Sequence, residues 1–505
     1  MQPAAYLYST SLCHSPQLYT FAHHTIALAM KYFLNILATA FFSLSAFAQP
    51  DKYLGLWEGD LNAGVQTIRF VFSFTPTDNA VGIKLSIQAP QQSPLYIPTD
   101  TLIIQEDNSI FTEKKQFKMS FKGKLVNDST LSGEFTQGAA FPLLLKKVEK
   151  ASVIEKTKRP QTPRPPYSYK SIEVNFTNQT NTIRFGGTLT LPDTLTAQKY
   201  PAVILITGSG PQDRDETILG HKPFAVIADY LTKNGWAVLR VDDRGVGKTT
   251  GNHATATSAD FADDKEAALN WLQKNKWIDA KRIGLIGHSE GGMIAPLLAA
   301  RRKDIKAIVL LAGPGVKGFD LMTEQNIAIY EANGLSKADA EAYGAMYKEL
   351  TKAIIDAGDK EAAISAAVAV LDNWNASEPL RKTFNVYTPE EKTAFAKAMT
   401  AEIYNDWFRY FFNYNPAPAL KKLSCNVLAL NGSKDIQVLP HSNLEGIKAA
   451  LKKSKSKSYE VKEIPGLNHL FQTCKSCTLN EYGTLEESFS PVVLGQLNEW
   501  LQKNL

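Results

Sequence analysis

The chain has 505 residues, of which 44% are hydrophobic and 21% are charged. These values are ordinary for globular proteins, so they exclude disorder, collagen and coiled coil as descriptions of the whole chain. The length predicts two or three domains. The 55 basic and 50 acidic residues leave a net charge of +5, and a balance this even gives no reason to expect a nucleic-acid or membrane-surface partner.

The N-terminus has the pattern of a secretory signal peptide. Residues 33–42 form an apolar run that follows a lysine, and a small-residue sequence Ala-Phe-Ala stands at 46–48. Residues 1–29 contain no Lys, Arg, Asp or Glu. We therefore interpret residues 1–48 as an upstream extension plus a signal peptide, with translation starting at Met30. This predicts a periplasmic or secreted protein with no membrane attachment after cleavage; the alternative is an anchor that stays uncleaved.

Two regions precede the part of the chain that carries the chemistry. Residues 49–150 contain short runs that alternate in period two, such as 67–74 and 81–87, separated by turn residues. Several short strands at this spacing predict a small all-β domain, either a barrel or a sandwich. Residues 151–168 are rich in proline and basic residues, which predicts an extended, semi-rigid linker.

From 169 to 505 the pattern is that of an α/β domain. Two strands at 171–176 and 183–191 are expected to form a hairpin, and apolar strands then alternate with helices. Near-continuous apolar strands indicate a parallel sheet covered on both faces. The strands expected after the hairpin are 202–207, 236–241, 282–286, 307–312, 426–430 and 459–464, and the helices between them are 224–234, 259–274, 291–301, 442–452 and 491–501.

The alternation is interrupted between about 317 and 420 by an Ala/Glu/Lys-rich helical stretch. A helical block inserted between two sheet strands predicts a cap outside the carboxyl ends of the strands, where ligands bind in such sheets. Four aromatic residues near the end of this block are candidates for lining an acyl pocket, although a cluster with helical spacing is more often core. They are Trp407, Phe408, Tyr410 and Phe411.

The sharpest functional signal is Gly287-His-Ser-Glu-Gly291, which follows the strand 283–286 and opens the helix 291–301. A strand, a G-x-S-x-G turn and a helix form a nucleophile elbow. The turn is so sharp that side chains at 287 and 291 would collide, so both positions must be small. Ser289 is left exposed at the top of the sheet as the candidate nucleophile, next to a helix N-terminus that favours developing negative charge.

His469 is the candidate base. It follows the strand 459–464 on a loop at the same carboxyl edge of the sheet as Ser289. The other histidines after residue 48 fit the role less well, because they stand in the elbow itself, at expected helix starts or in a polar loop: His288, His221, His441 and His253.

Asp435 is the candidate carboxylate that orients the base, since it follows the strand 426–430 at that edge. The chain order Ser289, Asp435, His469 is the one found in hydrolases with an elbow.

An oxyanion hole needs two backbone N–H donors. We expect one from Glu290, the residue after the nucleophile, and the other from Ser209 in the glycine-rich loop after the strand 202–207. The sequence Gly245-Val-Gly-Lys-Thr249 mimics a phosphate-binding loop but lacks its first glycine, because Asp242 stands there. We interpret it, together with Asp243 and Arg244, as a structural turn with an internal ion pair.

Five segments of the chain together resemble the α/β-hydrolase superfamily, and the resemblance extends over residues 170–503. It is strongest to a branch of bacterial carboxylesterases that often carry a β domain ahead of the hydrolase domain. The five segments are Gly208–Asp215, Asp243–Gly247, Gly287–Gly292, Asn431–Asp435 and Leu467–His469. The related serine aminopeptidase branch shares much of the pattern. The resemblance implies acyl transfer to water by a Ser-His-Asp triad. One departure is Thr207-Gly208 where many relatives have His-Gly, which bears on the oxyanion assignment and not on the triad.

The sequence thus predicts an exported serine carboxylesterase with a small ester substrate, no cofactor and no metal. A serine peptidase of the same fold is the first alternative, and it would need cap carboxylates such as Glu324 or Glu331 to hold a substrate amine. A non-catalytic binding protein is the second. Of the three cysteines after residue 48, Cys474 and Cys477 are close enough to form a disulfide, whereas Cys425 lies at the opposite sheet edge.

Overall fold

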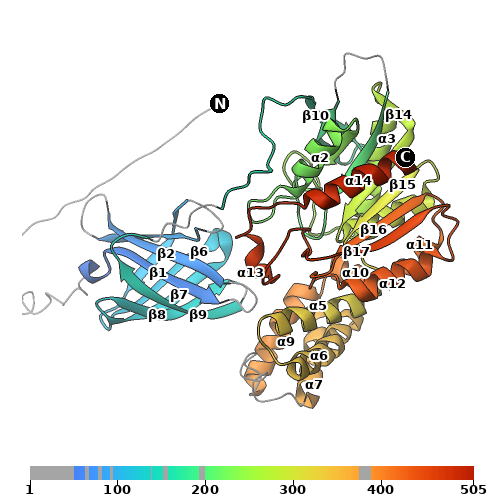
Figure 1. Cartoon of the computed structure of the whole chain (residues 1–505). Helices are drawn as coiled ribbons and strands as arrows, with labels where there is room; N and C mark the ends of the chain where they lie inside the picture. The colour runs from blue at the N-terminus through green and yellow to red at the C-terminus, as the bar shows by residue number, and fades with distance from the viewer. Residues whose placement is uncertain are drawn as a thin grey trace, which may run out of the picture.

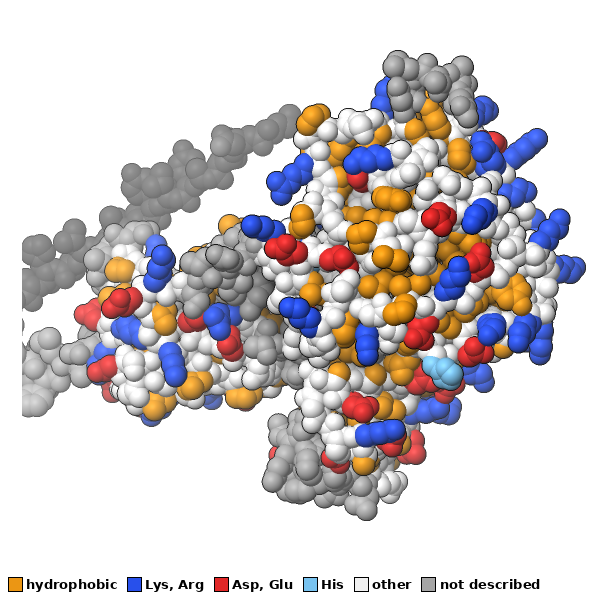
Figure 2. All heavy atoms as spheres, in the orientation of Figure 1, with side chains coloured by type: hydrophobic (Ala, Val, Ile, Leu, Met, Phe, Trp, Pro, Cys, Tyr) orange, Lys and Arg blue, Asp and Glu red, His pale blue; other side chains and the backbone are white. Residues whose placement is uncertain are grey.

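The structure is a computed structural model, and it describes residues 50–62, 67–77, 82–90, 95–137, 139–151, 157–192, 199–374 and 388–505. The expected upstream extension and signal peptide at 1–48 lie outside these described residues. Among the helices that are described, none combines the length and the apolar character needed to cross a bilayer. On the face shown in Figure 2, acidic and basic side chains are interspersed over the surface.

The N-terminal domain is built from one antiparallel sheet, in which the described strands follow the order β4-β3-β2-β1-β9-β8-β7-β6-β5 (Figure 1). The sheet encloses a single core, in which Phe72 of β2 meets Phe121 of β7 edge-on with ring centroids 5.2 Å apart. Because the strands form one continuous sheet, the domain is an open barrel and not a sandwich of two sheets. The strands are β1 (Gly55–Asn62), β2 (Thr67–Pro76), β3 (Ile83–Gln88), β4 (Ile97–Pro98), β5 (Thr101–Ile104), β6 (Ser109–Lys114), β7 (Met119–Asn127), β8 (Thr130–Gln137) and β9 (Ala139–Val148), with short 3₁₀ helices η1 (Pro50–Lys52) and η2 (Lys115–Phe117).

The proline-rich segment after β9 is docked on the C-terminal domain. The guanidinium of Arg159 donates hydrogen bonds to the carbonyl oxygens of Leu485 and Gly483, both at 2.7 Å, and to that of Leu219 at 2.9 Å. The side chain of Gln161 accepts from the backbone N–H of Ser488 at 2.6 Å and donates to a neighbouring carbonyl at 2.7 Å. The described part of this segment is therefore attached at defined points, which its composition did not reveal.

The C-terminal domain is organised around a second sheet of order β10-β11-β13-β12-β14-β15-β16-β17. The expected hairpin of β10 and β11 is present, and β11 also pairs antiparallel with β13, whereas the remaining neighbours are parallel. The sheet is therefore mixed, with an antiparallel edge on a parallel body. The strands are β10 (Lys170–Thr177), β11 (Arg184–Leu191), β12 (Tyr200–Ile206), β13 (Ala237–Val241), β14 (Ile278–His288), β15 (Ala307–Leu311), β16 (Asn426–Gly432) and β17 (Tyr459–Ile464).

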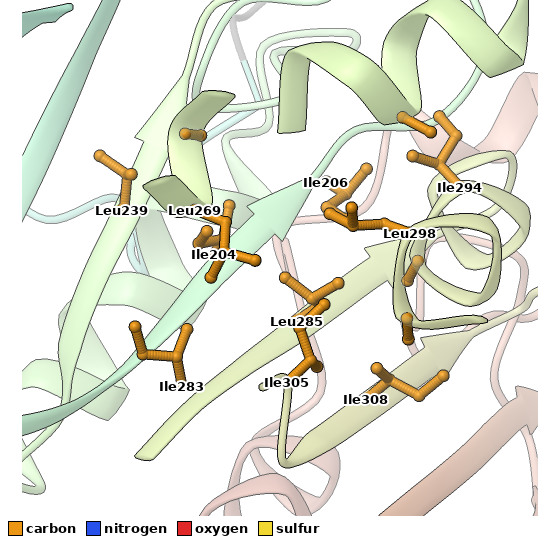
Figure 3. Close-up of a cluster of buried hydrophobic side chains, with 14 of the residues drawn as sticks. Ile204, Ile206, Leu239, Leu269, Ile283, Leu285, Ile294, Leu298, Ile305 and Ile308 are labelled. Carbon is orange, nitrogen blue, oxygen red and sulfur yellow. The ribbon is translucent and has the colours of Figure 1, made fainter. Parts of the chain in front are cut away.

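Helices cover both faces of this sheet, as the apolar strands require. On one face Ile204 and Ile206 of β12 pack with residues of two helices, such as Leu269 and Leu298 (Figure 3). The alternate residues of the same strand belong to the core on the other face. The helices are α3 (Ser258–Gln273), α4 (Gly291–Arg301), α11 (Pro416–Lys421) and α12 (Pro440–Leu451) on the first face, and α2 (Pro223–Lys233) and α14 (Pro491–Asn504) on the second.

The expected cap lies between β15 and β16. Its helices α5, α6, α7 and α9 gather into one bundle at one end of the domain (Figure 1), with a core of its own that includes Tyr347, Leu350 and Phe412. The cap helices are α5 (Gly318–Ala332), α6 (Lys337–Asp356), α7 (Lys360–Asn373), α9 (Pro389–Ile403) and α10 (Asp406–Asn413), and a short helix α13 (Leu479–Tyr482) follows β17.

The turn after β13 corrects one expectation. Asp243 and Arg244 do not pair with each other. Asp243 accepts a hydrogen bond from the buried Lys265 Nζ at 3.0 Å, and Arg244 binds Asp264 through two hydrogen bonds of 2.7 and 2.8 Å. Both partners belong to α3, so these ion pairs tie the turn to the helix that packs beside it.

Candidate active site

The elbow has the geometry that its glycines predict. Ser289 connects β14 to α4 with φ 53°, a left-handed conformation that residues with a side chain rarely adopt. A Cβ on Gly287 would lie 2.0 Å from the carbonyl oxygen of Gly291. A Cβ on Gly291 would instead lie 2.1 Å from the carbonyl oxygen of Ile206. Both positions need glycine: the constraint at 287 comes from the backbone of Gly291, and that at 291 comes from the neighbouring strand β12.

His469 and Asp435 lie together on the loops after β17 and β16. The Nδ1 atom of His469 is 2.8 Å from Oδ2 of Asp435, and the two side chains are 6% and 0% exposed. The other oxygen, Oδ1, accepts from the backbone N–H groups of Gln437 at 2.8 Å and Val438 at 2.9 Å. The carboxylate is therefore fixed from both sides and holds the imidazole by Nδ1, and within the described part of the chain no hydrogen bond engages Nε2.

Ser289 and His469 line one cavity of about 240 Å³, and Ser289 is only partly buried there. The structure thus brings all three predicted residues to one place, at the carboxyl ends of β14, β16 and β17.

The backbone N–H groups of Ser209 and Glu290 are the donors expected to form the oxyanion hole. Among the described residues, neither the Ser209 N–H nor the Glu290 N–H donates a hydrogen bond. The N–H of Gly208, by contrast, donates to Oε1 of Glu216 at 2.7 Å. Ser209 and Glu290 also line the cavity. Both donors named from the sequence therefore remain available to an oxyanion.

The side chain of Glu290 has a second role that sequence reasoning missed. Its Oε1 accepts from Ser258 Oγ at 2.6 Å and from the Trp407 indole N–H at 2.9 Å. Burial raises the pKa of Glu290, and the hydrogen bonds from Ser258, Trp407 and Ser209 oppose that rise. Glu290 therefore joins the elbow to α3 and to the cap. Its neighbour Trp407 was named from the sequence only as a candidate lining residue.

The cap supplies the apolar wall of the cavity. Of the four aromatic candidates, Trp407, Phe408 and Phe411 line it, whereas Tyr410 does not. The remaining apolar lining includes Leu321 and Met322 of α5. This side of the cavity is suited to an apolar acyl group.

The other histidines lie away from the nucleophile or serve different contacts. His441 is exposed near the start of α12, and His253 stacks on Phe261 with ring centroids 4.8 Å apart. His221 is fully buried behind the His469 loop. His288 contacts Glu216, a buried acid that the sequence analysis did not single out. The one sequence signal for Glu216 is that it directly follows the segment Gly208–Asp215, which carries part of the family resemblance.

The cysteines form the arrangement described from the sequence. Cys474 and Cys477 are joined by a disulfide with a Cα–Cα distance of 5.0 Å. Cys425 is a buried free thiol, and burial raises its pKa to about 11.

Comparison with known proteins is consistent with this geometry. A family model described as "Serine aminopeptidase, S33" matches residues 222–473, which contain the elbow, the cap and the loops with Asp435 and His469. The chain belongs to the α/β-hydrolase superfamily. An all-β domain precedes its α/β-hydrolase domain.

Individual relatives match shorter stretches. The chain is similar to "Esterase EstD" of Thermotoga maritima, with 31% identity over 168 residues, which is 32% of this chain and 40% of the relative. An uncharacterized 31.7 kDa protein of Escherichia coli is 35% identical over 83 residues, covering 16% of this chain and 29% of that protein. The aligned parts thus span less than half of the length of these curated relatives.

Solved structures resemble about two thirds of the chain. The esterase Pf2001 of Pyrococcus furiosus covers 67% of this chain and 92% of its own, with 17% identity and a TM-score of 0.39. The α/β hydrolase GrgF from Penicillium covers 66% and 99%, with 16% identity and a TM-score of 0.38.

Proposed function

We propose that this protein is an exported serine carboxylesterase that hydrolyses small esters through a Ser289–His469–Asp435 triad. The observation that carries the proposal is that His469, paired with the buried Asp435, lines the same cavity as Ser289, which stands on a strained turn between a strand and a helix. Nucleophile, base and orienting carboxylate are the three parts that acyl transfer to water requires.

The geometry assigns a role to each group. His469 Nε2 takes the proton of the Ser289 hydroxyl as Oγ attacks the ester carbonyl. The new oxyanion accepts hydrogen bonds from the backbone N–H groups of Ser209 and Glu290. The C–O bond to the alcohol then breaks, and His469 returns the proton to the leaving oxygen, which leaves an acyl-enzyme. A water molecule, deprotonated by His469, then attacks the acyl carbon. The bond from that carbon to Ser289 Oγ breaks, His469 returns the proton to Oγ, and the acid is released. Asp435 keeps the imidazole in the correct tautomer and stabilises its cation throughout.

An ester is favoured over an aminoacyl substrate by the charges in the cavity. Its described lining residues include two acids, Glu216 and Glu290. Glu216 pairs with His288, and burial raises the pKa of Glu290, which favours its neutral form. Neither is therefore a free anion for a substrate ammonium. The cap acids suggested for that role, Glu324 and Glu331, do not line the cavity, and Glu324 accepts a hydrogen bond from Ser442 Oγ at 2.5 Å.

The size of the cavity supports a small acyl group. Pockets for drug-sized ligands have volumes of about 300–1,000 Å³, whereas this one measures about 240 Å³. A relative named as an esterase supports the same reaction class. Export is supported by the signal-peptide pattern and by the Cys474–Cys477 disulfide, since such bonds persist in oxidising compartments.

Labelling with a fluorophosphonate and hydrolysis of p-nitrophenyl acetate test the proposal. Ser289→Ala should lose labelling and lose on the order of 10⁴-fold or more in kcat/KM. Ser365→Ala, which removes an exposed hydroxyl on α7, is the matched control and should behave like the wild type. Retention of labelling in Ser289→Ala would refute the nucleophile, and faster hydrolysis of aminoacyl-p-nitroanilides than of esters would favour the peptidase alternative.

A further inference from the structure

The histidine of the elbow is enclosed by hydrogen-bond acceptors. His288 is 6% exposed, and its Nδ1 lies 3.0 Å from Oε1 of Glu216 while its Nε2 lies 3.0 Å from the backbone carbonyl oxygen of His469. A carbonyl oxygen and an ionised carboxylate can only accept hydrogen bonds. Both ring nitrogens must therefore carry a hydrogen for both contacts to form, and an imidazole with two N–H groups is a cation.

Glu216 is the matching anion. It is 4% exposed, and its Oε1 accepts both the His288 ring N–H and the Gly208 backbone N–H. Its Oε2 has no hydrogen-bond partner among the described residues, so a proton placed there would find no acceptor. The proton shared by Oε1 and Nδ1 is assigned to His288, because the Gly208 N–H donates to the same Oε1 and a hydrogen bond donated to a carboxylate favours its ionised form. A buried charge is tolerated where it is paired and hydrogen-bonded.

The charged and titratable groups that act on His288 are Glu216, His469 and Asp435. The rings of His288 and His469 lie with centroids 4.9 Å apart. Burial is the largest influence on His288 and favours its neutral form. The charge and hydrogen bond of Glu216, the His469 carbonyl and the charge of Asp435 together outweigh burial, so the pKa of His288 is raised above its ordinary value.

The pair connects two separate parts of the candidate site. Through Glu216 it holds the N–H of Gly208, and among the described residues the N–H of the next residue, Ser209, has no acceptor and is left for the oxyanion. Through His288 it holds the backbone of the residue proposed as the base. Glu216 reaches this position with φ 52°, a conformation that is unfavourable for a residue with a side chain. Strain of this kind is maintained only when the surroundings enforce it.

We propose that Glu216 and His288 form a buried ion pair that positions the oxyanion loop and the His469 loop relative to Ser289. The inference rests on the roles proposed above for Ser289 and His469. Both members are positioning residues, since they act through the Gly208 N–H and the His469 carbonyl. Loss of the His288 proton at alkaline pH removes one of its two hydrogen bonds, so turnover should fall there.

The protonation state can be measured without any assay of activity. Imidazole ¹⁵N NMR on the full chain, with His288→Gln to assign the signal, should show both nitrogens of His288 protonated at pH 7.5. In Glu216→Gln the same ring should carry a single N–H at that pH. A single N–H on His288 in the wild-type protein would overturn the proposal, whatever the outcome of the Ser289 experiment.

Kinetics test the positioning role. Per fluorophosphonate-reactive site, Glu216→Gln should lose about ten- to hundredfold in kcat, as misplacement of a reacting group does, with KM little changed. The alkaline fall in kcat should also move to lower pH, and Glu216→Asp should restore part of the loss. Glu463→Gln, an exposed acid on β17, is the control and should match the wild type. A Glu216→Gln enzyme with wild-type kcat and pH profile would show that the pair is only structural.

Discussion

Acidification should destabilise the protein through His221, a histidine that takes no part in the proposed reaction. Its ring is 0% exposed, with Nδ1 2.8 Å from Ser488 Oγ and Nε2 2.8 Å from the carbonyl oxygen of Tyr482. The neutral ring can make both contacts, with Nε2–H donating to the carbonyl and Nδ1 accepting the serine hydroxyl. The Gln472 amide nitrogen, 3.0 Å from Nε2, then donates to the Glu487 carbonyl instead. Burial lowers the pKa of His221 to about 4, and the nearby charge of Arg159 acts in the same direction.

The sign and size of the effect follow from linkage. A folded-state pKa of about 4 lies below the unfolded value of about 6.5, so the unfolded chain binds the proton first. The stability that neutral His221 contributes is present above about pH 6.5 and is lost as the pH falls toward 4. Between pH 7.5 and pH 5 the loss is about 2 kcal/mol, and it approaches about 3 kcal/mol at pH 4.

Urea unfolding at pH 7.5 and pH 5 measures this loss. His221→Gln keeps a donor and an acceptor but cannot be protonated, so its free energy of unfolding should fall by about 2 kcal/mol less than that of the wild type over the same interval. His441→Gln, at an exposed position, is the control and should keep the wild-type pH dependence. An identical acid response in His221→Gln and wild type would refute the reasoning.

Three further outcomes follow from the structure. Asp435→Asn should lose roughly 10⁴-fold in kcat, because the amide holds His469 in the wrong tautomer; near-normal turnover on p-nitrophenyl acetate would contradict this. Mass spectrometry of the non-reduced, alkylated protein should find Cys474 bonded to Cys477, whereas alkylation at both would exclude the bond. Deletion of residues 49–156 should leave an active hydrolase, because it keeps Arg159 and Gln161, which attach the linker to the C-terminal domain. Deletion of residues 49–168 removes both and should lower the thermal midpoint of unfolding. Equal midpoints for the two truncated chains would show that these contacts contribute no stability.

The arrangement of strands and helices could be predicted because it depends on local pattern. Strands such as β12 and β14 are apolar runs bounded by turn residues, and the helices between them have the length and periodicity of covering helices. The elbow could be located for the same reason, since the glycine requirement at 287 arises within five residues of chain. Where a constraint comes from another strand, as at Gly291, the glycine was predicted but its contact with β12 was not.

Contacts between distant segments could not be predicted. Glu216 and His288 are 72 positions apart, and Ser258 and Glu290 are 32 apart. No periodicity links the members of such pairs, because they meet only through the packing of whole elements. The same reason explains the turn after β13: adjacent Asp243 and Arg244 suggested a local ion pair, but α3 offers Lys265 and Asp264 to them instead. A composition rich in proline likewise did not indicate that Arg159 binds backbone carbonyls of the other domain.

The proposed catalytic residues are positioned by the sheet, whereas the apolar wall of the pocket is formed by the cap, so each can change without the other. β15 and β16 are hydrogen-bonded neighbours in register, with Ala307 opposite Asn426, so the inserted helices leave the sheet undisturbed. Asp435 and His469 follow the cap in sequence but are placed by the sheet. The hydrogen bond from Trp407 to Glu290 joins the cap to the elbow itself. A substitution elsewhere on the apolar wall should therefore change acyl preference alone, whereas one at Trp407 should change acyl preference and turnover together.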